Sequence, residues 1–187
     1  MIPARVSDLR PSGPAVWLWI GFVVLASLGL SRVFACAMPF AALATLAALI
    51  LRTRDACALV ILAWLANQAV GFGLLHYPWT ASTVAWGLAI GIAALAGLVA
   101  ASAVASRRVL SSWIVAPAAL LPAFGAYELV LFAATWLLPS GPGAFVAVVV
   151  LRILVINAVA LALLLLASRL AGRAALPDRT SAPATPA

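Results

Sequence analysis

Two ionisable residues, Glu128 and Arg152, interrupt long apolar stretches of this sequence. A charged side chain inside a lipid bilayer is costly, so it marks either a functional site or a paired structural contact. If the two stretches form neighbouring antiparallel helices, both side chains lie about 13–15 Å deep. The sequence therefore predicts a buried Glu128–Arg152 ion pair, which either fixes the helix register or acts as a proton- or substrate-coupled gate.

Three side-chain amides lie in the same apolar stretches. Asn67 and Gln68 are adjacent near the middle of one stretch, and Asn157 follows Arg152 in another. Five residues turn an α-helix by about 140°, so Asn157 and Arg152 do not fully share a face. These amides either line a substrate pocket or bond one helix to another. The candidate polar cluster, for substrate or for structure, is Asn67, Gln68, Glu128, Arg152 and Asn157.

Patterns typical of enzymes and metal sites are missing from the sequence. It has no Gly-x-Ser-x-Gly, His-Glu-x-x-His or Walker motif. The two cysteines, Cys36 and Cys57, are too far apart along a helix to form a disulfide. The single histidine, His76, precedes Tyr77 and is typical of an aromatic anchor at the membrane interface. We therefore expect no enzyme, no catalytic residue, no metal site and no cofactor.

The composition requires lipid as the solvent. The 187 residues are 67% hydrophobic and only 8% charged, whereas soluble domains carry about 25% charged residues. All of the positive charge comes from Arg, because the chain has no Lys. These Arg residues are scattered between apolar runs, so we expect the lipid bilayer as the partner and no nucleic acid.

The apolar runs predict an all-α fold, a polytopic transmembrane helix bundle of about six spans. Each run is near the ~20 residues that a bilayer core requires. The predicted spans are 14–31, 33–51, 56–76, 82–105, 112–138 and 143–167. The chain then divides into a cytoplasmic tail 1–13, a transmembrane domain 14–168 and a disordered cytoplasmic tail 169–187.

The distribution of Arg predicts the orientation. The tails and alternate loops on one side hold Arg5, Arg10, Arg52, Arg54, Arg107, Arg108, Arg169, Arg173 and Arg179, and the other side holds Arg32. Positive loops face the cytoplasm, so both termini are expected there. The first run is long for a cleaved signal peptide and is interpreted as a retained anchor. Arg without Lys suggests a GC-rich bacterial genome, and hence a multi-pass protein of the bacterial inner membrane.

Small residues recur every fourth position in the fourth span. They are Ala89, Ala93, Gly97, Ala101 and Ala105, with Gly87-x-x-x-Gly91 alongside. Such a stripe lets helix backbones approach closely, although in an Ala-rich chain it also arises by chance. It predicts a central helix, or a contact with other membrane subunits. In the fifth span, Pro117 and Pro122 predict a kink or break, which either serves packing or shapes a cavity.

Residues 64–78, which run from Trp64-Leu-Ala-Asn67-Gln68 to His76-Tyr77-Pro78, carry a resemblance. They resemble uncharacterised small six-span inner-membrane proteins of GC-rich proteobacteria, some of them encoded near cobalamin-synthesis genes. In size and span count the chain is also similar to the substrate-binding subunits of energy-coupling-factor vitamin transporters. It departs from those subunits because its first span lacks their Ala-x-x-x-Ala stripe and its outer loops are short.

These observations predict small-solute or vitamin-related transport, for example as a transporter substrate-binding subunit. The alternative is a non-transporting membrane scaffold or assembly factor. A solute binder needs its polar residues around a cavity, whereas a scaffold needs an apolar or small-residue stripe exposed to its partner.

Overall fold

The computed structural model describes residues 15–33, 38–106, 114–139 and 145–174. These residues form helices without any strand, which confirms the all-α prediction for the described part of the chain. The helices are α1 (Ala15–Val33), α2 (Phe40–Ile50), α3 (Thr53–Ala69), η2 (Val70–Leu74), α4 (Ala81–Ala105), α5 (Val115–Ala134) and α6 (Ala147–Ala174). Here η2 is a π-helical turn that continues α3.

Four helical segments in the described residues are long and apolar enough to cross a bilayer. They are Thr53–Leu74, Ala81–Ala105, Val115–Ala134 and Ala147–Leu170. Many of their large apolar side chains are exposed on the outside of the bundle, as lipid contact requires. The fold is therefore that of an integral membrane protein.

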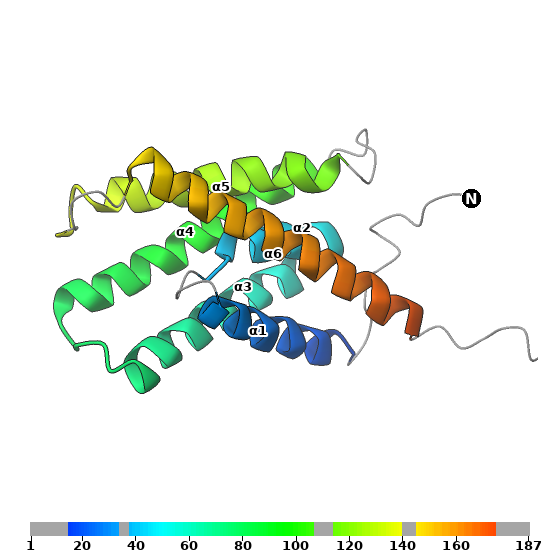
Figure 1. Ribbon diagram of the computed structural model, residues 1–187, viewed down its shortest axis with the longest axis horizontal. Coiled ribbons are helices and arrows are strands. Elements are labelled where there is room, and N and C mark those ends of the chain that lie inside the picture. The colour runs from blue at the N-terminus through cyan, green and yellow to red at the C-terminus, as the bar shows by residue number, and fades with distance from the viewer. Residues whose placement is uncertain (1–14, 34–37, 107–113, 140–144, 175–187) are drawn as a thin grey trace, which may run out of the picture.

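Successive helices run in alternating directions (Figure 1). The start of α3, which carries Arg52 and Arg54, lies toward the same end of the bundle as the end of α6, which carries Arg169. The turn between α3 and α4 lies at the opposite end. The helix ends that carry these three Arg residues therefore lie toward one end of the bundle.

The second predicted span, 33–51, is wrong as a full-length helix. Within the described residues α2 has only 11 residues, about 16 Å at the α-helical rise and roughly half of a bilayer core. Its helix begins after Pro39, which has no amide hydrogen to donate and is itself buried. The count of six spans is therefore not established, and α2 is a short apolar helix inside the bundle.

The short helix α2 forms the core of the molecule. It packs against α3, α4, α5 and α6, and every side chain from Phe40 to Ala47 is buried. Its one polar side chain, Thr45, is fully buried and donates its hydroxyl to Ala41 O at 2.8 Å. Because α2 is rich in alanine, four longer helices can close around it at short range.

The buried N-terminus of α2 needs hydrogen-bond acceptors, because the first amides of a helix have no partner within it. Pro39 provides no side-chain cap. Asn157 of α6, only 3% exposed, provides one from a distant part of the chain. Its Oδ1 accepts from Ala42 N at 2.9 Å, and its Nδ2 donates to Ile153 O at 2.9 Å.

The predicted small-residue stripe on α4 is a packing surface within the chain. Gly97 is buried, and a Cβ added to it would lie 3.0 Å from the backbone oxygen of Ala123 on α5. Ala93 and Ala101 are 0% exposed. The stripe therefore brings the backbones of α4 and α5 together within the chain. The central position predicted for this span belongs to α2.

The remaining differences between the predicted spans and the structure concern the prolines of α5 and the end of α6. α5 is one continuous helix with Pro122 inside it, so the predicted break is absent. Pro117 is the third residue of α5, where a missing amide hydrogen costs little. α6 continues to Ala174, beyond the predicted domain boundary at 168. The predicted tail 1–13 and residues 175–187 of the predicted C-terminal tail lie outside the described residues.

Candidate solute pocket at the turn between α3 and α4

The end of α3 widens into the π-helical turn η2, and a tight turn then reverses the direction of the chain. In η2 the hydrogen bonds span five residues, as from Leu75 N to Val70 O at 2.9 Å. Tyr77 N then donates to Gly71 O at 3.0 Å. Between them His76 adopts a left-handed backbone with φ 54°, which is uncommon for a residue other than glycine. Single π-helical turns of this kind often occur at functional sites.

The start of α4 is fixed by a hydroxyl cap. Thr80 Oγ1 accepts from Thr83 N at 3.2 Å, and the two hydroxyl groups are hydrogen-bonded at 2.8 Å. A side-chain oxygen at this position satisfies one of the free amides of the first turn. The turn after η2 and this cap together order the connection between α3 and α4.

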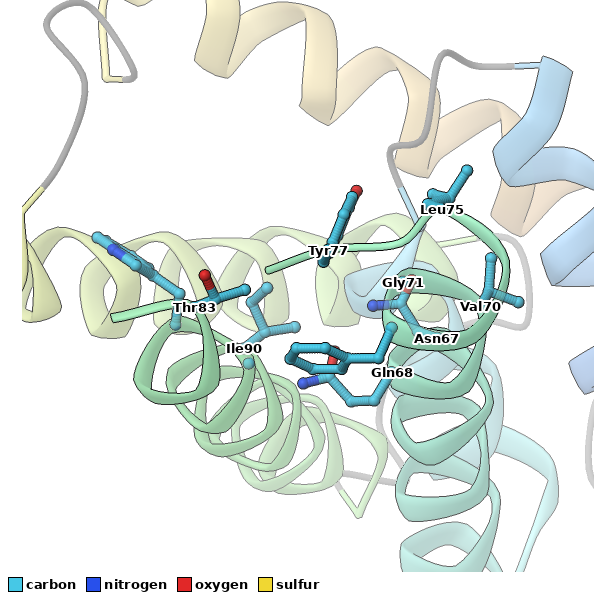
Figure 2. A pocket seen from close by; sticks show the side chains of 11 residues that line it. Asn67, Gln68, Val70, Gly71, Leu75, Tyr77, Thr83 and Ile90 are labelled. Atoms are coloured by element: carbon cyan, nitrogen blue, oxygen red, sulfur yellow. The ribbon is translucent and has the colours of Figure 1, made fainter. Parts of the chain in front are cut away.

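A cavity of about 200 Å³ lies between the end of α3 and the start of α4. Asn67 and Gln68 reach into it from α3, and their amide groups point toward the side where Thr83 and Ile90 lie (Figure 2). The lining residues are Asn67, Gln68, Val70, Gly71, Phe72, Leu75, Tyr77, Thr83, Trp86, Gly87 and Ile90.

Two glycines of α4 make room for two large side chains of α3. The Gln68 amide nitrogen occupies the space that a Cβ of Gly87 would need. A Cβ on Gly91 would lie 2.9 Å from the indole of Trp64. The Trp64 indole N–H donates to Gly87 O at 2.7 Å. The Gly87-x-x-x-Gly91 motif therefore leaves space on α4 that the side chains of Trp64 and Gln68 occupy.

The aromatic side chains around the turn pack on one another and on the pocket. Phe72 stacks on Trp79 with ring centroids 4.3 Å apart. The Tyr77 ring lies against Gly71, where a Cβ would come within 3.0 Å of it. Trp86 donates its indole N–H to Pro139 O at 2.9 Å, which links the pocket to the chain beyond α5.

The amides of Asn67 and Gln68 are free to bind another molecule. Both residues are half-buried, and neither side chain has a hydrogen-bond partner among the residues that the structure describes. A side-chain amide offers two donor hydrogens and one acceptor oxygen. The pocket therefore presents unused donors and acceptors beside aromatic walls.

The five residues of the predicted polar cluster do not come together. Asn67 and Gln68 share the pocket, whereas Asn157 caps α2 in the interior of the bundle. Glu128 is half-buried on α5 and Arg152 is exposed on α6. Across the described ranges no ion pair joins them, so the structure does not form the predicted pair. The reason is packing: α5 and α6 meet only slightly, because α2 packs against both of them.

The sequence contained a signal for the close fit between α3 and α4 beside the pocket, in which Gln68 was the one residue of the candidate set. Trp64 and Gln68 are spaced four apart on α3, as are Gly87 and Gly91 on α4. Large side chains at that spacing opposite glycines at the same spacing indicate a side chain-to-backbone fit between two helices. His76, which was expected to be an interfacial anchor, has an exposed side chain whose Nδ1 lies 3.1 Å from Leu74 O. Its left-handed backbone had no sequence signal.

Comparisons with known proteins give no relative on which function could be argued. No protein-family model matches the chain, no curated protein matches it, and no solved structure matches it.

Proposed function

We propose that this protein binds a small solute within the membrane and acts in the uptake of that solute. The observation that carries the proposal is the pair of half-buried amides, Asn67 and Gln68, which face a cavity without a partner among the described residues. Ligand sites are typically apolar concavities with a few well-placed polar groups, and this pocket has that composition.

The position of the pocket fits uptake. It lies at the turn between α3 and α4, at the end of the bundle opposite Arg52 and Arg54 (Figure 1). If the Arg-bearing ends face the cytoplasm, as the positive-inside rule proposes, the pocket opens to the outer side of a bacterial inner membrane. Both chain termini then lie in the cytoplasm.

The proposed link to vitamins rests on resemblance alone. Residues 64–78 resemble uncharacterised small membrane proteins, some of them encoded near cobalamin-synthesis genes, and this segment includes the lining residues Asn67, Gln68 and Tyr77. A scaffold function has less support, because the small-residue stripe that it would present to a partner is covered by α2 and α5.

The test is an uptake comparison in bacterial cells. Cells expressing the native chain and cells expressing the Asn67→Leu, Gln68→Leu double variant receive the same mixture of B vitamins, nucleobases and small amides. Mass spectrometry then compares what the two strains accumulate at equal membrane levels of protein. We expect at least one compound to accumulate with the native chain and to fall with the variant. Equal accumulation of every compound contradicts the proposal.

A further inference from the structure

The charge, size and hydrogen-bonding groups of the pocket limit the class of molecule that it can bind. We infer that the pocket takes an uncharged, planar, single-ring molecule with an amide or imide edge. This inference rests on the proposed function, because it names the class of solute that the same pocket would bind.

The absence of charge in the lining excludes an ionic ligand. All of the lining residues are apolar, aromatic, hydroxyl-bearing or amide-bearing, with no acid and no base among them. Removing a charged group from water without an opposite charge is strongly unfavourable. A carboxylate or an ammonium ion therefore lacks the partner that it would need here.

The two amides match a ligand edge that both donates and accepts. Asn67 and Gln68 are adjacent in the sequence, and Figure 2 shows their amide ends directed into the same space. An amide or imide presents a donor N–H beside an acceptor oxygen, which complements this arrangement. A hydrocarbon ring without such an edge would leave both amides unpaired, at the cost of their lost hydrogen bonds to water.

The size and the walls of the pocket fit one ring. An apolar cavity of about 150 Å³ in another protein holds benzene, and this cavity has about 200 Å³. A corrinoid is many times larger and does not fit inside it. Phe72 and Trp86 line the space, and aromatic side chains favour stacked or edge-on contact with planar rings.

Gly87 sets the position of the Gln68 amide and provides a selective test. A Cβ at residue 87 overlaps the Gln68 amide nitrogen, which is the far end of a flexible side chain and can swing away. Gly87→Ala therefore moves Gln68 while retaining it. Gly125→Ala is the matched control, since nothing lies within 4 Å of its added Cβ.

The experiment measures binding to the full-length protein in detergent by isothermal calorimetry. The probes are two pairs that share a ring, nicotinamide with nicotinate and uracil with orotate. We expect a neutral member to bind at least about tenfold more tightly than its anion. We expect Gly87→Ala and Gln68→Leu each to weaken that binding by about tenfold, and Gly125→Ala to leave it unchanged.

Three results overturn the inference. They are tighter binding of an anion than of its neutral partner, binding that Gly87→Ala leaves unchanged, and no binding of either neutral probe. The uptake comparison remains independent of these results. A compound of another class whose accumulation depends on Asn67 and Gln68 would retain the proposed function and reject only this ligand class.

Discussion

The two halves of α4 carry glycines and alanines at the same four-residue spacing but use them differently. Around Gly97 and Ala101, the small residues bring the α4 backbone against α5 and α2, and the contact is closed. Around Gly87 and Gly91, the same spacing admits Trp64 and Gln68 of α3. A small-residue motif in lipid therefore has two outcomes, which depend on whether the facing helix presents backbone or large side chains.

The largest loss of stability is expected in the half of α4 around Gly97 and Ala101. Gly97→Leu forces a side chain into a space where the Ala123 backbone oxygen lies 3.0 Å from an added Cβ. Because backbone cannot swing away, the helices must separate, and we expect a loss of about 3 kcal/mol in the free energy of unfolding. Unfolding in detergent measures this loss. Val99→Leu is the control, since Val99 is 71% exposed. Equal stability of the two variants would show that α4 and α5 are not in close contact.

A smaller loss is expected from uncapping α2. Asn157→Ala leaves the Ala42 amide without its acceptor in a buried position, which costs about 2 kcal/mol of unfolding free energy. The matched control is Asn67→Ala, the same substitution at a half-buried amide that has no partner among the described residues. We expect the control to change stability little. If both variants unfold alike, the α2 cap contributes nothing and the assignment of Asn157 to structure is wrong.

In the half of α4 around Gly87 and Gly91, the effect of adding a methyl group should depend on which atoms of α3 occupy the space beside the glycine. Gly91→Ala meets the Trp64 ring at 2.9 Å, and that ring is fixed by its hydrogen bond to Gly87 O. We expect a loss of about 1 kcal/mol from such overpacking. Gly87→Ala meets only the mobile amide end of Gln68, so its loss should be smaller. Thermal unfolding of both variants in one detergent gives the order, and the reverse order would contradict the assigned packing.

The two halves of α4 also show which features of the fold could be predicted from the sequence. The helical fold and the packing of Gly97 followed from composition and spacing, because both depend on local pattern. The short length of α2 did not, since its N-terminus is set by Pro39 together with an amide from distant Asn157. The pocket could be predicted only in part. Asn67 and Gln68 were identified from the sequence as polar residues within an apolar span. The cavity that they face could not be predicted, because it depends on how α3 packs against Gly87 of α4.

The smallest effect is expected for Glu128 and Arg152. At the helical rise Arg152 lies only about 7–8 Å from the start of α6 at Ala147, and it is exposed. A long cationic side chain in that position can reach the lipid headgroups by itself. We therefore expect Glu128→Gln and Arg152→Gln to have additive effects on unfolding free energy, with a coupling below about 0.5 kcal/mol.

A double-mutant cycle in detergent measures that coupling, and a second cycle shows that the method can detect one. Gly91→Ala combined with Trp64→Leu should recover part of the stability that Gly91→Ala loses, because the smaller side chain frees the space beside residue 91. A coupling above about 1 kcal/mol between Glu128 and Arg152 would show that the two charges meet. In that case α5 and α6 approach each other closely, and the ion pair predicted from the sequence forms, either to fix the helix register or to act as a gate.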